Sequence, residues 1–408
     1  MSLSLMSSVI VHYQELALKG RNRPWFVHTL VRAIRRVLSD LPVEGVRALM
    51  GRIEVKLGPD APWPDVRSRL AGLPGIGNFS LATHVAPDLE LIADGIVSNL
   101  GGRPAKPFRI AARRADKRFP LPSPDIERLL GRRVQDATGW PVNLKHPEFV
   151  IHVEIVTNDA FYYFDRDRGP GGLPTGTSGK VACLISGGID SPVAAWRMIR
   201  RGCRAYFIHF HSYPILSRTS QDKVRTQVEL LTRHQLRSRL FLVPFAPIQQ
   251  QIVVSVPPPL RVVIYRRLML RIAERIAREV DAHALVTGDC VGQVASQTVE
   301  NLGVIGSVVT MPLLRPLVGF DKEEITAEAQ KLGTYEVSVI PDEDCCTLFT
   351  PRFPATRARH AAATLAEAEL DIPGLVERAA DLAVVEDFRF PGDKIRRSPE
   401  PALQGDLT

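Results

Sequence analysis

The sequence is poor in cysteine and lacks any long apolar run, and each absence excludes a class of protein. Its 408 residues include five cysteines, an odd number, with no C-x-x-C pair. A disulfide framework typical of secreted proteins is therefore not indicated, and neither is a zinc or iron–sulfur site on paired cysteines. No stretch comes near the roughly 20 apolar residues that a transmembrane helix needs, and the first residues do not have the pattern of a signal peptide. We expect a cytoplasmic protein with no membrane partner.

The glycine-rich turn at residues 186–191, Ser-Gly-Gly-Ile-Asp-Ser, lacks the Gly-Lys-Ser/Thr ending of a Walker A loop. An NTPase that cleaves between the β- and γ-phosphates is therefore not indicated. The apolar run at 181–185 predicts a buried parallel strand before the turn, and Pro192 suits the first turn of a helix after it. Backbone N–H groups and the helix dipole at such a turn favour an anion. The turn resembles the pyrophosphate loop of ATP pyrophosphatases, which activate a substrate by adenylation; a glycine turn without a ligand is the alternative.

The charge is unbalanced towards cations, with a formal net charge of +8. Residues 101–120 hold seven lysines and arginines against one acid, Asp116. An excess clustered in this way points to a polyanionic partner, and the interleaved Phe108 and Phe119 suit stacking. A solvated surface strand and loop is the alternative interpretation. The cations at the end of the predicted strand are Arg109, Arg113, Arg114, Lys117 and Arg118.

The order of predicted elements divides the chain into α+β and α/β domains. Residues 1–77 read as β-α-β-β-α, which favours a small ferredoxin-like domain. Residues 78–168 form a second α+β domain, and the glycine- and proline-rich segment 169–179 is a linker. Strands alternate with helices over 180–390, which predicts a doubly wound parallel sheet with its ligand at the carboxyl ends of the strands. The polar tail 391–408 is expected to be disordered.

Several motifs in register resemble one family, the ThiI-type tRNA 4-thiouridine synthetases, across residues 9–370. These motifs are Glu15–Arg23, Arg113–Pro120, Gly171–Lys180, Ser186–Ala195, Gly292–Thr298 and Arg315–Lys322. The resemblance implies an N-terminal ferredoxin-like domain, a THUMP domain that binds tRNA, and a PP-loop (ATP-pyrophosphatase) domain that binds ATP and Mg²⁺. The basic stretch lies in the THUMP region, so its five cations become candidates for RNA binding.

The resemblance also implies the residues of a nucleotide pocket. Carried over by position, the ATP-binding set comprises Leu184, Ile185, Ser186, Gly187, Gly188, Asp190, Ser191, His209, Phe210, Arg266, Gly288 and Gln297. Asp190 and Lys322 match positions that the family needs for adenylation. Mg²⁺ is expected with ATP near Asp190 and not on a cluster of protein ligands.

The implied reaction has two steps. O4 of the tRNA uridine at position 8 attacks the α-phosphate of ATP and releases pyrophosphate, and sulfur then displaces AMP at C4 to give 4-thiouridine. Backbone N–H groups, Mg²⁺ and the cations Arg266 and Lys322 would neutralise charge in the first step. A cysteine persulfide suits the second step, because sulfur delivery needs a soft nucleophile.

Five cysteines are available for that step. Cys345 and Cys346 lie where the family places its catalytic cysteine; the spacing to Pro354 favours Cys346, and the spacing back to Lys322 favours Cys345. We select Cys346, with Cys345 as the alternative. Cys183 and Cys203 lie in apolar strands and are expected to be packing residues, whereas Cys290 is expected near the nucleotide loop.

The chain ends at Thr408 without the rhodanese-like domain of one branch of the family. We therefore expect a cysteine desulfurase to donate the sulfur as a persulfide. The same feature weakens the link to sulfur transfer for thiamine thiazole synthesis, a role that the family name carries. A homodimer agrees with the family, although no residue pattern requires it.

Two other functions stay open. A different PP-loop enzyme, an amidating or ligating one that acts on RNA, would use the same loop but not the cysteine pair. A non-catalytic tRNA-binding nucleotide sensor would keep the basic domain. Detection of thiolated RNA would exclude the first, and loss of thiolation without loss of RNA binding in Asp190→Ala would exclude the second.

Overall fold

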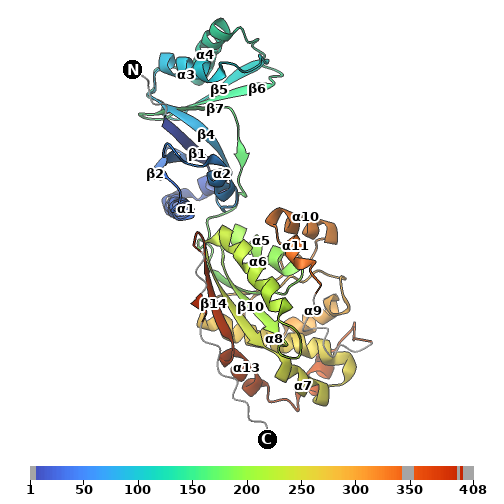
Figure 1. Cartoon of the computed structure of the whole chain (residues 1–408). Coiled ribbons are helices and arrows are strands. Elements are labelled where there is room, and N and C mark those ends of the chain that lie inside the picture. The colour runs from blue at the N-terminus through green and yellow to red at the C-terminus, as the bar shows by residue number, and fades with distance from the viewer. Residues whose placement is uncertain (1–5, 342–352, 393–395, 398–408) are drawn as a thin grey trace. The chain divides into compact units, whose positions relative to one another are not determined.

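The chain divides into two compact units, residues 1–174 and residues 175–408, so the division falls inside the expected linker. The structure is a computed structural model that describes residues 6–341, 353–392 and 396–397 (Figure 1). The cysteine pair Cys345 and Cys346 lies outside the described residues. Among the described helices, none is long and apolar enough to span a bilayer.

Unit 1 is an α+β unit whose strands and helices alternate as the sequence predicted. Its elements are β1 (Met6–His12), η1 (Glu15–Leu18), η2 (Gly20–Asn22), α1 (Arg23–Val37), β2 (Val43–Leu49), β3 (Arg52–Leu57), α2 (Trp63–Ala71), β4 (Asn78–Val85), α3 (Leu89–Leu100), β5 (Phe108–Arg114), α4 (Ser123–Thr138), β6 (Phe149–Ile155), β7 (Ala160–Tyr163) and β8 (Asp167–Arg168).

These strands form one sheet in the order β2-β3-β1-β4-β7-β6-β5, with β8 paired to β4. β4 pairs with β1 along Met6–His12, and with β7 along only Thr83–Val85. The sequence had placed residues 78–85 in the second domain, whereas the longer ladder makes β4 the fourth strand of the ferredoxin-like half. Hydrogen bonds to strands on both sides, which no local pattern encodes, decided this.

The two faces of this sheet differ in polarity. Tyr162 lies on the face that packs against α3 and α4, in a core with Ile151 and Ile110. The opposite face carries a buried polar network, in which Glu54 and Glu154 are each 1% exposed. Ser8 donates to Glu54 at 2.7 Å and Tyr163 donates to Glu154 at 2.7 Å, so both buried carboxylates are hydrogen-bonded.

Unit 2 is the α/β unit. Its elements are β9 (Lys180–Leu184), α5 (Asp190–Arg200), β10 (Arg204–His211), α6 (Thr219–Gln235), β11 (Arg237–Pro244), α7 (Ala246–Ser255), η3 (Pro258–Leu260), α8 (Arg261–Glu279), β12 (Leu285–Val286), η4 (Ala295–Gln297), α9 (Val299–Gly306), β13 (Leu313–Leu314), α10 (Lys322–Leu332), α11 (Tyr335–Ser338), α12 (His360–Glu367), α13 (Ile372–Asp381), β14 (Val384–Arg389) and β15 (Arg396–Arg397).

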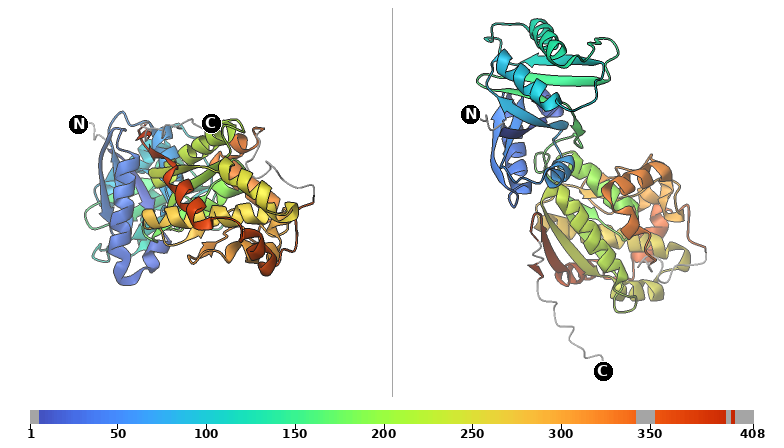
Figure 2. Two further views of the ribbon diagram at one scale, coloured as in Figure 1. Left: turned by 90° about the horizontal axis from the view of Figure 1, so that it is seen from below. Right: turned by 45° about the horizontal axis from the view of Figure 1, so that its top comes forward.

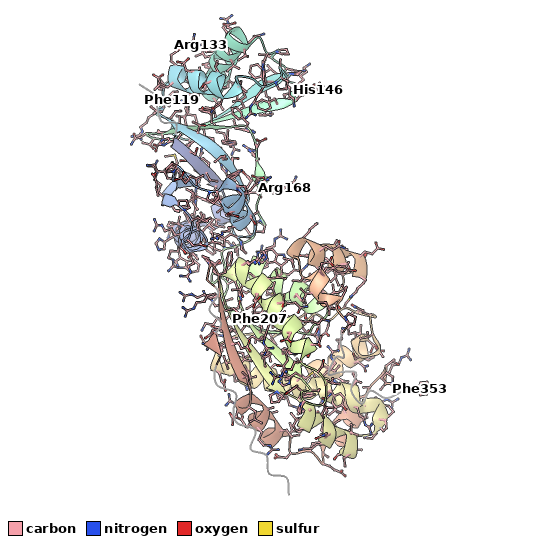
Figure 3. The ribbon with its side chains drawn as sticks, in the orientation of Figure 1. Phe119, Arg133, His146, Arg168, Phe207 and Phe353 are labelled. Atoms are coloured by element: carbon pink, nitrogen blue, oxygen red, sulfur yellow. The ribbon has the colours of Figure 1, made fainter. Side chains whose placement is uncertain are left out.

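The sheet of unit 2 has the order β13-β12-β9-β10-β11-β14-β15, and its first five strands are parallel. Ala182 faces a core with α7, α8 and α13, and its neighbour Cys183 faces a second core with α5 and α6. Phe207 of β10 lies inside this unit (Figure 3). A sheet with a core on each face confirms the predicted doubly wound architecture.

Two antiparallel strands extend this sheet beyond the prediction. β14 pairs with β11, and β15 pairs with β14 through Glu386–Arg397 and Asp387–Arg396 (Figures 1 and 2). Residues 396 and 397 therefore form a strand, whereas the sequence predicted a disordered tail from Pro391. Their polarity suggested disorder, but an edge strand needs only backbone partners and no buried apolar face.

Candidate active site

The glycine turn lies where the strand order of unit 2 reverses. β9 has β10 on one side and β12 on the other, and the turn follows β9 directly. Ser191 closes the turn: its Oγ accepts from the N–H of Ser186 at 2.9 Å and donates to the carbonyl of Ser186 at 3.2 Å. Ligands of doubly wound sheets bind at this kind of switch point, outside the carboxyl ends of the strands.

Two charged side chains from distant helix starts meet beside this turn. Nζ of Lys322, the first residue of α10, lies 2.8 Å from Oδ1 of Asp190, the first residue of α5. The other oxygen of Asp190 accepts from Nε2 of Gln293 at 2.9 Å. The start of α10 is fixed by a capping box between Asp321 and Glu324, so the position of Lys322 follows from its own sequence.

Gly288, after β12, is needed for a close backbone approach. A Cβ atom at this position would lie 2.8 Å from the nitrogen and 2.9 Å from the Cα of Ser191. No larger residue fits without a shift of backbone atoms. The segment after β12 and the start of α5 therefore form one continuous wall.

A cavity of about 280 Å³ opens at this wall. Of the twelve residues predicted for ATP binding, ten line it: Leu184, Ile185, Ser186, Asp190, Ser191, His209, Phe210, Arg266, Gly288 and Gln297. Gly187 and Gly188 do not line it but lie in the turn beside it. Nδ1 of His209 donates to the carbonyl of Ile185 at 3.0 Å and so ties β10 to the start of the turn.

Sequence reasoning missed part of the lining, namely Ile208, Val262, Met269, Thr287, Asp289, Val294 and Ser296. Val262 and Met269 lie four residues before and three residues after Arg266 on α8, the spacing of one helix face. This spacing could have predicted both residues from the sequence. No sequence pattern marks Asp289 as a lining residue, because only the fold shows that its carboxylate is buried, at 3% exposure, beside Arg266.

The turn is also held from behind. Nε2 of Gln227 on α6 lies 3.2 Å from the carbonyl oxygens of both Gly187 and Gly188, and 3.0 Å from Oγ of Ser338 at the end of α11. Gln227 is fully buried. Nζ of Lys223, one helical turn earlier, donates to the carbonyl of Ile340 at 2.7 Å. One face of α6 thus contacts both the turn and the residues just before position 342.

Comparisons with known proteins match all of these regions. Residues 176–372 match the family described as thiamine biosynthesis protein (ThiI), residues 8–80 the ThiI ferredoxin-like domain and residues 87–165 the THUMP domain. A Thermus thermophilus protein named "Probable tRNA sulfurtransferase" is 47% identical over 395 residues, 96% of each chain. A Brevibacillus brevis protein of the same name is 42% identical over 385 residues, 93% of this chain and 96% of its own. The chain belongs to the ThiI family of tRNA sulfurtransferases.

A solved structure agrees with this assignment. It is a crystal structure of a 4-thiouridine synthetase–RNA complex with bound ATP, 36% identical, with a TM-score of 0.86 over 94% of this chain and 100% of that one. The family assignment and the predicted fold class are therefore confirmed.

The cysteines of this family member lie in different settings. Cys183 and Cys203 are buried, as expected of packing residues, and burial raises the pKa of both thiols. Cys290 is also buried, and its Sγ donates to the carbonyl of Phe320 at 2.8 Å. Burial and the nearby Asp190 raise the pKa of the Cys290 thiol. All three thiols are therefore poor nucleophiles at neutral pH.

The five predicted RNA-binding cations of the THUMP region fall into two groups. Arg109, Arg113 and Lys117 are exposed, and no ion pair is found for them among the described residues. Arg114 donates to the carbonyls of Phe119 at 2.7 Å and Leu121 at 3.2 Å, so it stabilises its own loop. The guanidinium of Arg118 binds Asp116 at 2.7 Å. The first group is better placed for phosphate contacts, because its charges are not already neutralised.

Proposed function

We propose that the chain is an ATP-dependent tRNA sulfurtransferase, which converts the uridine at position 8 of tRNA to 4-thiouridine. The observation that carries the proposal is the meeting of Asp190 and Lys322 beside the glycine turn, at a cavity lined by ten of the expected nucleotide contacts. The family relatives named as tRNA sulfurtransferases and the ATP- and RNA-bound 4-thiouridine synthetase support it.

In the first step, ATP lies in the cavity with its phosphates at the turn. The turn from Gly187 leads directly into α5, which begins at Asp190, and the backbone N–H groups and dipole at this helix start favour phosphate. Lys322 and Arg266 supply positive charge beside the turn and on the cavity wall. These groups stabilise the charge that develops as the uridine O4 attacks the α-phosphate and pyrophosphate leaves.

The residues at the turn also fit Mg²⁺. Mg²⁺ is bound in ATP sites by one or two carboxylates together with phosphate oxygens and waters. The carboxylate of Asp190 lies beside the turn and is 19% exposed, with its oxygens bonded to Lys322 and Gln293. No group of three or more His, Cys, Asp or Glu side chains suited to a metal occurs among the residues that the structure describes. Asp190 would hold the ion with the nucleotide, where it would neutralise phosphate charge.

In the second step, the terminal sulfur of a cysteine persulfide attacks C4 of the uridine and AMP leaves. A second thiol then attacks the sulfur of the carrier cysteine, so that 4-thiouridine is released and the two thiols are joined as a disulfide. We propose Cys346 as the persulfide carrier and Cys345 as the alternative; both lie outside the described residues. The buried, raised-pKa thiols Cys183 and Cys203 are unsuited to this role. The proposal also includes a cysteine desulfurase as sulfur donor, a cytoplasmic location and a homodimer. Sulfur transfer for thiamine is a separate prediction.

The reaction itself is tested with the purified chain, unmodified tRNA, ATP, Mg²⁺, a cysteine desulfurase and cysteine. Nucleoside analysis should detect 4-thiouridine, and omission of ATP should abolish it. Cys346→Ala should lose the product and Cys345→Ala should retain it; the reverse pattern would move the persulfide to Cys345. Absence of thiouridine despite binding of both ATP and tRNA would contradict the proposal.

A further inference from the structure

A buried carboxylate lies between two arginines at the wall of the nucleotide cavity. The carboxylate belongs to Asp289, which is 3% exposed and follows β12. Oγ1 of Thr287 donates to Oδ2 of Asp289 at 2.7 Å, and Nε of Arg315 donates to the same oxygen at 3.2 Å. The other oxygen, Oδ1, accepts from Nη2 of Arg266. Both oxygens are therefore hydrogen-bonded.

The topology of the sheet brings these residues together. β12 and β13 are parallel neighbours, so Asp289 after one strand and Arg315 after the other lie at the same edge of the sheet. Arg266 reaches them from α8. Burial alone would raise the pKa of the Asp289 carboxyl, but Arg266, Thr287 and Arg315 lower it overall. The carboxylate is thus kept charged in a buried position.

Of the two arginines, only Arg266 lines the cavity among the described residues. Its Nη1 is directed to the carbonyl and Oγ of Ser296, at 3.3 and 3.4 Å, while Nη2 is held by Asp289. A long arginine side chain loses much rotamer freedom when it binds a ligand, and a partner that fixes its guanidinium in advance removes this cost. Asp289 is placed to do this for Arg266.

We propose that Asp289 is a positioning residue that orients Arg266 for nucleotide binding, an inference that rests on the proposed use of this cavity for ATP. Asp289 also lines the cavity, but both of its carboxylate oxygens are occupied by Arg266, Thr287 and Arg315, so we assign it a role through Arg266. Arg315 in turn holds Asp289, because its Nη2 is anchored on the carbonyl of Leu302 at 3.2 Å. Arg315 therefore fixes Asp289, Asp289 fixes Arg266, and Arg266 binds the nucleotide.

Asp289→Asn is the direct test, because it keeps the shape of the side chain and removes its charge. Loss of one charge-assisted hydrogen bond should raise the dissociation constant for ATP about 10-fold. The constant is measured by calorimetry on the full chain with ATP and Mg²⁺, without tRNA or sulfur. In the thiolation assay the same variant should raise KM for ATP more than it lowers kcat, which a purely structural defect would not do.

A second acid–arginine cluster, whose arginines lie on α8 as Arg266 does, supplies a matched control. Glu367 of α12 is 7% exposed and binds Arg267 at 2.8 Å and Arg271 at 2.8 Å, both on α8. None of the three is among the residues that line the cavity. Glu367→Gln makes the same chemical change in an equivalent acid–arginine cluster. It should lower the melting temperature as Asp289→Asn does, but leave the ATP dissociation constant unchanged.

Arg315→Gln keeps the test decisive if Asp289→Asn does not fold. Arg315 is not among the lining residues; it binds Asp289 and the carbonyl of Leu302, and of these two partners only Asp289 lines the cavity among the described residues. In Arg315→Gln the dissociation constant for ATP should rise about 3-fold, less than in Asp289→Asn. An unchanged ATP dissociation constant in folded Asp289→Asn and Arg315→Gln would overturn the role of Asp289 but not the proposed function. An equal rise of this constant in Glu367→Gln would do the same. Absence of ATP binding by the unmodified chain would overturn the proposed function and this inference with it.

Discussion

The Nζ of Lys322 lies 2.8 Å from Oδ1 of Asp190, although 132 positions separate the two residues. Each is the first residue of a helix, α10 and α5. The side chain of Lys322 is 49% exposed and that of Asp190 is 19% exposed, so the ion pair itself contributes little stability. The ion pair instead keeps two opposite charges next to the turn, where a bound polyphosphate can become a new partner of Lys322.

Substitution of this pair should affect catalysis far more than folding. We expect Lys322→Gln and Asp190→Asn each to lower the rate of 4-thiouridine formation on the order of 100-fold, the usual effect of removing one preorganised charge-stabilising group. RNA binding, measured by fluorescence anisotropy, should not change. Lys331→Gln, in the last turn of α10, is the control and should retain full activity. Equal losses in Lys331→Gln would contradict a specific role for Lys322.

Gly288→Ala should remove nucleotide binding by steric conflict. The added Cβ would lie 2.8 Å from the backbone nitrogen of Ser191, so the wall of the cavity must shift, at a cost of about 1–3 kcal/mol of stability. Gly303→Ala is the matched control, because this exposed glycine of α9 has nothing within 4 Å of an added Cβ. It should leave ATP binding unchanged and raise stability by about 0.5–1 kcal/mol. Chemical denaturation and calorimetry with ATP distinguish the two.

Gln227→Ala should destabilise the glycine turn, because Gln227 of α6 binds its backbone. The substitution removes the buried amide that contacts the carbonyls of Gly187 and Gly188 and the hydroxyl of Ser338. Unsatisfied buried groups cost about 1–3 kcal/mol, and we expect KM for ATP to rise. Gln330→Ala, an exposed change on α10, should alter neither quantity. Normal ATP kinetics in a destabilised Gln227→Ala would limit the role of Gln227 to folding.

RNA binding should separate the two groups of THUMP cations. Arg109→Ala and Arg113→Ala should each weaken tRNA binding and reduce the slope of log K against log salt by about 1, with little effect on stability. Arg114→Ala should destabilise the loop, because Arg114 binds two of its carbonyls. Arg133→Ala on α4 (Figure 3) is the control, because the side chain of Arg133 is already paired with Glu90 at 3.2 Å. Salt titrations of binding would contradict this division if Arg133→Ala changed the slope equally.

The stability of unit 1 should fall at mildly acidic pH. Burial, together with Arg52, Arg166 and Arg113, lowers the pKa of His12 to about 4, although its Nε2 lies 2.9 Å from Oε1 of Glu154. The unfolded chain binds a proton near the usual pKa of about 6.5 and the folded chain does not, so stability is present above about pH 6.5 and is lost as the pH falls towards 4.

Denaturant unfolding at about pH 7.5 and about pH 5 measures this effect. His12 alone should account for about 2 kcal/mol of the difference. His12→Gln should reduce the difference in the free energy of unfolding between the two pH values. The same substitution at the exposed His146 should leave this difference unchanged (Figure 3). A pH dependence that is identical in His12→Gln and in the unmodified chain would contradict the prediction.

Local sequence was a good guide wherever one element carries the signal. The apolar run before Ser186 became β9, and Asp190 opens α5 as the motif implied. The basic stretch after Phe108 became β5 and its loop, with Arg109 and Arg113 exposed. Its charge pattern could not tell that Arg114 binds carbonyls and Arg118 binds Asp116, because those contacts depend on the path of the loop.

The sequence by itself determined the two kinds of unit, the order of their elements and the family, because periodicity and short motifs are properties of neighbouring residues. Only the tertiary structure decided that β4 joins β1 to β7, that β14 and β15 extend the parallel sheet, and that Asp289 lies between Arg266 and Arg315. Strand pairing and buried ion pairs join residues far apart in the chain. Their free energy comes from desolvation and hydrogen bonding that exist only after the elements have packed.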